Sequence, residues 1–299
     1  MSIIIVKKIE NTCAFMSDTR VSIDSKDKSV TGNDKLRLPP EEGVLKIHIL
    51  FQSICIAFAG TVNICTNILH NLCTYKPRDI NLILKFLQDG LIQNNDDSAF
   101  IASFATPTGL KLYKVDNKKI EEGESFWIGV KDAFSEFQHS YLKENEYGKL
   151  NKNFSRAFSD MLINTSIPSI GDFVIGAYYN TENSSFIYEE GMEVKGGFGV
   201  INAKAKITTA LSEGTVNEGA FVVTKLVSHR IDKPAICLYF SKGKLGFLYL
   251  PISQVNKDAN PVVIKNVSIE ELKDIILKDH EIEVFGFNID LGKFKFIQK

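Results

Sequence analysis

The sequence predicts an α+β protein in which two antiparallel sheets lie face to face with helices outside them. Three observations predict this class. Blocks of strand-like residues alternate with pairs of helical segments, short turns join successive strand-like runs, and four such runs precede the first helical pattern. Short turns favour antiparallel hairpins, whereas parallel strands need a long crossover between them.

The first four strands are expected as two hairpins. Residues 3–7 and 12–16 are rich in β-formers on either side of a polar break, which predicts a pair of strands. The polar stretch from residue 21 to residue 43 has a Pro-Pro pair near its end and predicts a surface loop or an extended hairpin tip. The apolar run at residues 44–60 divides at Gln52, which predicts the second hairpin.

Helical spacing begins after this second hairpin. Apolar residues recur about every four positions in two successive segments: Ile64, Ile68 and Leu72, then Ile80, Leu84, Leu87 and Leu91. Strand-like runs return at residues 99–105, 109–115 and 125–130. Two further helical segments have aromatic faces (Phe134, Phe137, Tyr141; Phe154, Phe158, Met161), and a hairpin is expected within residues 173–190.

The pattern changes beyond about residue 190, so we divide the chain into a domain of residues 1–190 and a C-terminal α+β extension of residues 191–299. Strand-like runs in the extension are residues 221–229, 235–241, 244–252 and 283–289. Ser268 and Glu271 have the spacing of a capping box, which predicts the start of a helix over IEELKDIILK.

Composition excludes several classes of function. With 299 residues and a formal net charge of -1, the chain has no bulk attraction for nucleic acid or anionic lipid. No apolar run reaches the roughly 18 residues of a membrane helix, and Lys7 and Lys8 interrupt the N-terminal run. We therefore expect a cytoplasmic protein without nucleic-acid or membrane partners.

Cysteine and histidine residues predict no metal or cofactor. The five cysteines form no CxxC pair, and four of them lie in apolar runs, so we interpret them as reduced core residues. The five histidines are scattered, without an HExxH motif or a second ligand at metal spacing.

Two stretches carry a resemblance to a known family: SIIIVKKIENTCAFMSDTR at residues 2–20 and KIHILFQSICIAFAGT at residues 46–61. Together they resemble the β-type subunits of the proteasome and its bacterial ring-protease relative, of the N-terminal-nucleophile (Ntn) hydrolase class. In that family a mature N-terminal Thr begins a strand, an Asp-Thr-Arg-like triplet ends a hairpin, a Lys begins the next strand and a Gly turn opens the first helix. The similarity extends to about residue 190 and implies a four-layer αββα sandwich.

The resemblance implies a role for each matching residue. Ser2 stands at the position of the nucleophile, 16 residues before Asp18 (18 − 2). If Met1 is removed, which the small Ser2 permits, the α-amino group has an unperturbed pKa of about 8 and can take the hydroxyl proton. Lys46 would lower the pKa of that amine, Asp18 would hold Lys46, and Gly60 would offer a backbone oxyanion donor. Lys35 is the alternative lysine, but only Lys46 keeps an ungapped run to Gly60.

The chain also departs from the family pattern. Where the family has Gly-Ser-Gly, this chain has Val130 after Gly129. Where the family has an Asp followed by Ser-Gly-Gly, Ser166 stands at the position of the Asp, while Ser169 is retained. Part of the shell that supports the nucleophile is therefore missing.

Three functions remain open from the sequence. The leading hypothesis is an Ntn-type peptide or amide hydrolase acting on a peptide or an unfolded protein, without a cofactor or metal. Family analogy adds a ring homo-oligomer fed by an ATP-dependent unfoldase. The alternatives are a non-catalytic, proteasome-like scaffold or binding subunit acting through its C-terminal extension, and a small-molecule amide hydrolase. By the resemblance, the side chains near the acyl pocket are Val21, Val44, His48, Phe58 and Val62.

Overall fold

The fold is α+β, as the sequence predicts, and all strand pairs are antiparallel. The structure, a computed structural model, describes residues 3–19, 44–77, 79–145, 150–164, 167, 170, 173–195, 221–230, 232–240, 244–254 and 261–286. Within this part of the chain, three five-stranded sheets and five helices are present. The polar stretch predicted as a loop or hairpin tip at residues 21–43 lies outside the described residues.

The first sheet contains the N-terminal hairpin at its centre. Its strands stand in the order β10-β9-β2-β1-β8. Their bounds are Ile3–Ile9 (β1), Thr12–Asp18 (β2), Ser125–Gly129 (β8), Val174–Asn180 (β9) and Ser185–Tyr188 (β10). Side chains of β1 alternate between two hydrophobic cores: Ile4 and Val6 face one core, and Ile3 and Ile5 face the other. A strand buried on both faces explains why the chain is apolar from its third residue.

The second sheet begins with the predicted second hairpin. Its order is β3-β4-β5-β6-β7. The bounds are Ile47–Leu50 (β3), Ile54–Ala59 (β4), Ala99–Thr106 (β5), Gly109–Val115 (β6) and Ile120–Glu122 (β7). The first turn falls at Phe51 and Gln52, as expected, and both have positive φ. The three-residue strand β7 was not predicted, because so short a run carries no periodic signal.

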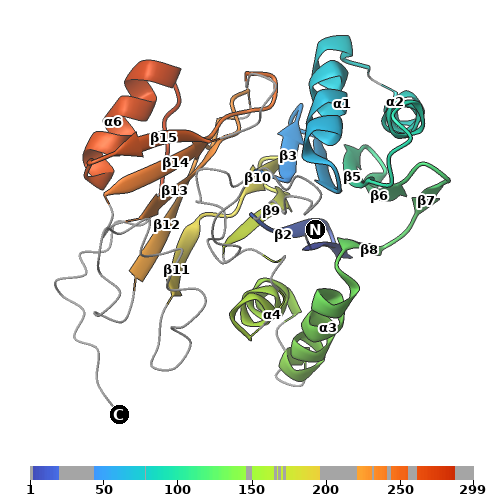
Figure 1. Cartoon of the computed structure of the whole chain (residues 1–299), viewed down its shortest axis with the longest axis horizontal. Helices are drawn as coiled ribbons and strands as arrows, with labels where there is room; N and C mark the ends of the chain where they lie inside the picture. The colour runs from blue at the N-terminus through green and yellow to red at the C-terminus, as the bar shows by residue number, and fades with distance from the viewer. Residues whose placement is uncertain are drawn as a thin grey trace, which may run out of the picture.

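Pairs of helices cover the two sheets on opposite sides. Their bounds are Val62–Tyr75 (α1), Ile80–Gln93 (α2), Lys131–Asn145 (α3) and Leu150–Asn164 (α4). The predicted apolar faces are buried: Leu72, Leu84 and Leu87 pack on the second sheet, and Phe154 and Phe158 pack on the first. In Figure 1, α1 and α2 lie at the top and α3 and α4 at the bottom, with strands of both sheets between them.

The third sheet is formed by the C-terminal part of the chain and runs in sequence order from β11 to β15. The bounds are Gly191–Lys195 (β11), Phe221–Val227 (β12), Ile236–Phe240 (β13), Leu245–Tyr249 (β14), Val262–Lys265 (β15) and Ile269–His280 (α6). The capping box predicted for the last helix is present, since Ser268 accepts from the Glu271 backbone and Glu271 accepts from that of Ser268. Strands β11 and β15 were not predicted.

One expectation for the third sheet is wrong. Residues 283–289 were expected to form a strand, but in the described part, which ends at Gly286, the segment makes a single bridge between Phe285 and Val227. β11 pairs with β12 only as far as Lys225, and β13 occupies the other edge of β12. The edge of β12 that faces β11 is therefore unpaired by β11 beyond Lys225, and there Val227 pairs with Phe285.

A common hydrophobic core joins the three sheets. It contains Phe15 of the first sheet, Ile101 of the second and Val223 of the third. Phe173 and Phe240 meet edge to face across the seam, with ring centroids 5.1 Å apart. The chain passes from the first sheet to the third between β10 and β11, close to the boundary drawn at residue 190.

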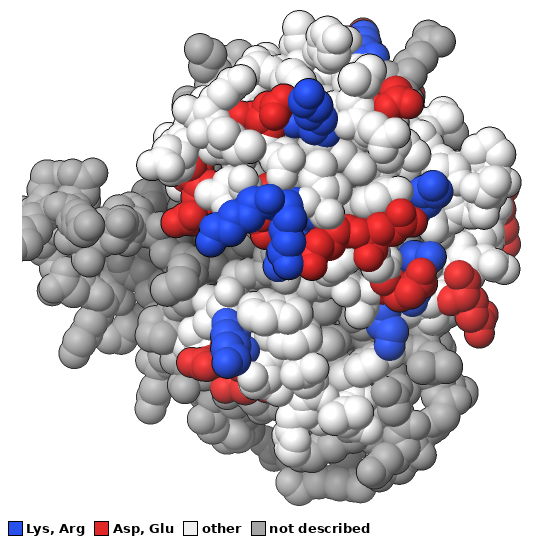
Figure 2. All heavy atoms as spheres, turned by 90° about the vertical axis from the view of Figure 1, so that its right-hand side faces the viewer, with Lys and Arg blue, Asp and Glu red and all other residues white. Residues whose placement is uncertain are grey.

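The described surface carries charges of both signs, and the cysteines lie in the interior. On the face in Figure 2, acidic and basic side chains of the described residues are intermixed and do not gather by sign. No described helix has the length and apolar character needed to cross a membrane. All five cysteines are free and buried, as predicted, and burial raises the pKa of the Cys13 thiol to about 12.

Candidate active site

A fully buried ion pair joins the end of β2 to the start of the second sheet. The Nζ atom of Lys46 lies 2.9 Å from Oδ1 of Asp18, and the two side chains are 1% and 0% exposed. The residues are 28 positions apart in the sequence, so the contact depends on how the two hairpins meet. The structure therefore brings together the aspartate and the lysine that the resemblance singled out.

The same carboxylate oxygen holds the first described residue of the chain. The backbone N–H of Ile3 donates to Oδ1 of Asp18 at 3.0 Å. β1 and β2 pair with Ile4 opposite Ser17, so Ile3 comes opposite Asp18 at the open end of the hairpin. Ser2, which lies outside the described residues, is joined by a peptide bond to the nitrogen that Asp18 holds.

Backbone hydrogen bonds fix the position of Lys46. The N–H of Val44 donates to the carbonyl of Thr19 at 3.1 Å, which brings the chain back beside the end of β2. The N–H of Phe58 donates to the Lys46 carbonyl at 3.0 Å, which ties Lys46 to β4. These two bonds hold the backbone around Lys46 next to the end of β2 and next to β4, and the Lys46 side chain extends to Asp18. The alternative lysine, Lys35, lies outside the described residues.

Burial gives this ion pair its chemical interest. Removing two charges from water costs several kcal/mol per ion, and their mutual attraction repays this only with good geometry and further hydrogen bonds. Asp18 has such a bond from Ile3. An ammonium group held in a dry site also acts strongly on any neighbouring group that gains or loses a proton, because little solvent screens it.

Gly60 lies beyond the end of β4, two residues after Phe58. Its φ of 135° is a conformation that other residues rarely adopt. A Cβ built at Gly60 would have Ser98 Oγ as its nearest neighbour, only 2.0 Å away, and the next two nearest atoms also belong to Ser98. Gly60 therefore packs closely against the segment before β5. Lys46 is linked to β4, the strand that leads to Gly60, through the hydrogen bond from Phe58.

The structure places the expected pocket side chains in the core. Val44 and Phe58 are buried in the cluster between the second sheet and α1 and α2, and Val62 packs against it. His48 is buried and stacks on Phe58 with ring centroids 5.8 Å apart and an interplanar angle of 5°. Val21 lies outside the described residues.

His48 is held as a neutral imidazole. Burial lowers its pKa to about 4, although a hydrogen bond with the backbone of Leu45 acts in the opposite direction. Its Nε2 atom is buried without a hydrogen-bond partner. His48 lies on β3, two residues after Lys46, which directly precedes that strand.

The region where the family has its supporting serine is only partly similar. Gly129 pairs with Ile3 across β1 and β8, and it has a φ of 110°. The next residue, Val130, is partly buried and packs against the core between the first sheet and α3 and α4. The other supporting positions, Ser166 and Ser169, lie outside the described residues.

Several polar residues around this end of the molecule were missed by sequence reasoning. Ser17 is buried with its hydroxyl unpartnered, directly before Asp18. Ser98 accepts a hydrogen bond from the Thr61 backbone. The Asp96-Asp97-Ser98 sequence directly before a strand was a usable signal for a side-chain-bonded turn. Among the described residues, no cluster of His, Cys, Asp or Glu could hold a metal ion.

Comparison with known proteins adds no family to this description: no family model matches the chain, and no curated protein sequence matches it.

Proposed function

We propose that the protein is an Ntn-type hydrolase that cleaves peptide or other amide bonds, with Ser2 as its nucleophile after removal of Met1. The observation that carries the proposal is the buried Asp18–Lys46 pair, whose carboxylate also accepts from the N–H of Ile3. An ion pair that is costly to bury is hydrogen-bonded to the backbone N–H of Ile3, the residue that follows the proposed nucleophile.

The arrangement of sheets and helices supports the same proposal. α1 and α2 pack on the second sheet, α3 and α4 pack on the first, and a common core lies between the sheets. We interpret this as the four-layer αββα sandwich of the Ntn hydrolases. The third sheet, with α6, would then be an extension whose inner face joins that core.

The proposed reaction uses a single residue as nucleophile and base. The α-amino group of Ser2 takes the proton of its hydroxyl, and Oγ attacks the carbonyl carbon of the amide. The ammonium group of Lys46 stabilises the negative charge that develops, and the Gly60 N–H donates to the oxyanion. The protonated amine then gives its proton to the departing nitrogen, leaving an ester on Ser2. Water hydrolyses the ester with the amine again acting as the base, so one amide and one water become an acid and an amine.

The helix after Gly60 supports its proposed role. α1 begins at Val62 and is 14 residues long, so its partial positive end lies next to this turn. A developing oxyanion beside the turn would gain from that dipole as well as from the glycine N–H. The proposal predicts slow turnover, because Val130 supplies no hydroxyl where the family has a serine.

One observation favours a second candidate, a non-catalytic scaffold or binding subunit on the same fold. Val130 occupies the position of the supporting serine and packs into the helix-covered core. In that case the Asp18–Lys46 pair is a structural feature and the third sheet carries the partner surface. A ring homo-oligomer and an unfoldase partner belong to both candidates by the same resemblance, and both would be cytoplasmic, as the sequence predicts.

The experiment uses a protein whose first residue is Ser2, released from a cleavable N-terminal fusion, and short acylated peptides with a fluorogenic amide. We expect slow turnover that Ser2→Ala lowers by at least about 1,000-fold, because loss of the attacking oxygen leaves only binding and oxyanion contributions. Ser135→Ala, on the exposed face of α3, is the matched control and should leave turnover unchanged.

A second measurement identifies the attacking atom. A peptide β-lactone should add its full mass to the Ser2-containing peptide and to no other. Turnover that persists in Ser2→Ala would place the chemistry at another residue. A protein with a free Ser2 amine that neither hydrolyses peptides nor reacts with the lactone would favour the scaffold.

A further inference from the structure

A hydrogen bond joins the Gly60–Thr61 turn to the segment directly before β5, the strand next to β4. Ser98, directly before β5, is buried, and its Oγ accepts a hydrogen bond from the Thr61 N–H at 2.8 Å. The N–H of Ser98 in turn donates to Oδ1 of Asp96 at 2.8 Å. One serine therefore joins the turn after β4 to the segment before β5.

Gly60 and Ser98 also fit each other sterically. A Cβ at Gly60 would lie 2.0 Å from Oγ, 2.4 Å from Cβ and 2.7 Å from Cα of Ser98. The last of these atoms belongs to the backbone and cannot rotate away. Any larger residue at position 60 must therefore move the turn away from Ser98, and the φ of 135° adds its own strain.

Thr61 contributes its side chain to the same network. It is the N-cap residue of α1 but makes no side-chain hydrogen bond to the helix. Partial burial raises the pKa of Asp96, but the nearby hydroxyls of Ser98 and Thr61 and the hydrogen bond from the Ser98 N–H together lower it below its usual range. The carboxylate is therefore ionised at neutral pH and accepts the bond from the Ser98 N–H.

The backbone of Asp96 is held by hydrogen bonds of its own. Its N–H donates to the carbonyl of Leu91 near the end of α2 at 3.1 Å. The Nδ2 atom of Asn117 donates to the carbonyl of Asp96 at 3.1 Å and to Oδ1 of Asp97 at 3.2 Å. The segment that holds the glycine turn is thus fixed to a helix and to the connection after β6.

We infer that Ser98 and Asp96 are positioning residues, which hold the Gly60–Thr61 turn so that the Gly60 N–H meets the developing oxyanion. This inference rests on the proposed function. The Thr61 N–H is already committed to Ser98, so the donor role belongs to Gly60. The Ser98 hydroxyl acts through the turn and does not itself touch the substrate.

The test uses the protein that begins at Ser2 and compares Ser98→Ala with wild type. We expect kcat to fall about 10- to 100-fold with KM within about 2-fold, because a small misplacement of a transition-state donor costs that much. Asp96→Asn keeps the oxygen that accepts from the Ser98 N–H and should lose less. Ser135→Ala, on the exposed face of α3, is the matched serine control and should match wild type.

A readout independent of turnover is amide hydrogen exchange at Thr61 in the ¹⁵N-labelled protein. Exchange should be faster in Ser98→Ala and unchanged in Ser135→Ala. Unchanged exchange in Ser98→Ala would show that Ser98 does not hold the turn. Faster exchange with an unchanged kcat would overturn the inference and leave the proposed function standing. An inactive wild type with free Ser2, which fails to react with the β-lactone, would remove both.

Discussion

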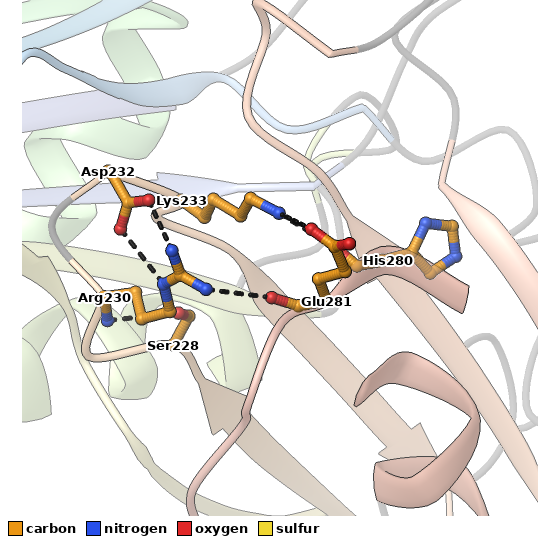
Figure 3. A network of polar contacts seen from close by, with 6 residues as sticks. All are labelled: Ser228, Arg230, Asp232, Lys233, His280 and Glu281. Atoms are coloured by element: carbon orange, nitrogen blue, oxygen red, sulfur yellow. Dashed lines mark hydrogen bonds and ion pairs between the residues drawn. The ribbon is translucent and has the colours of Figure 1, made fainter. Parts of the chain in front are cut away.

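Two ion-pair regions of this molecule differ in their access to water. Asp18 and Lys46 are 0% and 1% exposed and come from two different hairpins. In Figure 3, Arg230 pairs with Asp232 in the β12–β13 connection, and Lys233 pairs with Glu281 at the end of α6. Both acidic groups of that second region are more than half exposed.

The two regions therefore contribute in different ways. Exposed ion pairs add little to stability, because water and salt screen them and long side chains must be ordered to form them. In the exposed region the two cations also cap the end of α6. Arg230 donates to the carbonyl of Glu281, and Lys233 donates to that of His280. Water and salt do not screen the buried pair, so the free-energy cost of removing two charges from water falls at one site beside the N-terminal strand.

The largest expected effect comes from breaking the buried pair. Lys46→Met should lower the free energy of unfolding by about 3 to 5 kcal/mol, because the Asp18 carboxylate would remain buried without its cation. Urea unfolding at neutral pH measures this. The double variant Asp18→Asn/Lys46→Met should recover part of the loss, since no lone charge then remains.

Lys8→Met is the matched control for that experiment. Lys8 lies on β1 and pairs with the exposed carboxylate of Glu124, so its loss should be small. Equal losses in Lys46→Met and Lys8→Met would mean that water reaches the Asp18–Lys46 pair, and the contrast between the two regions would disappear.

The second effect is a pH dependence from His48. Its folded-state pKa is lowered to about 4 from an ordinary value of 6.5, so the unfolded state binds more protons between these values. Stability should therefore be fully present above pH of about 6.5 and decrease by about 3 kcal/mol as pH falls toward about 4. His48→Leu should remove this component of the pH dependence, as followed by urea unfolding at several pH values.

Other groups also titrate over this range, so a histidine control is needed. His139 is exposed on α3, and His139→Leu should keep the wild-type pH profile. A His48→Leu profile parallel to wild type would mean that the imidazole is hydrated in the folded state and does not share the dry surroundings of Lys46.

The smallest effect is expected from the exposed network. Arg230→Ala/Lys233→Ala should lower the melting temperature only slightly, and the difference should shrink in about 1 M salt, where the Debye length is about 3 Å. Hydrogen bonds from Arg230 and Lys233 lower the pKa values of Asp232 and Glu281. Their contribution is therefore present at neutral pH and lost as pH falls through these lowered values.

Salt separates the two regions most sharply. The deficit of Lys46→Met should persist in about 1 M salt, because ions cannot enter a buried site. A large, salt-resistant deficit in the Arg230→Ala/Lys233→Ala variant would contradict the distinction drawn here, and would mean that the end of α6 depends on these cations for its fold.

The sequence by itself determined the local elements. Runs of β-forming residues on either side of a polar break marked the hairpin of β1 and β2, four-residue spacing marked α1 and α2, and the Ser268–Glu271 spacing marked the start of α6. Each of these signals arises from residues within a few positions of one another, so it can be read without knowing the fold. Strand β15 and the single bridge at Phe285 were misjudged because their pairing depends on which strand edge is free.

The sequence predicted only part of the candidate site. Ordered motifs singled out Asp18, Lys46 and Gly60, and the first two do meet in the structure. Only the tertiary structure decided that Asp18 also holds the Ile3 backbone and that Ser98 packs on Gly60. It also decided that the third sheet shares the core of the first two. These contacts join residues from separate strands, and the packing of whole sheet faces, which no local pattern encodes, brings them together.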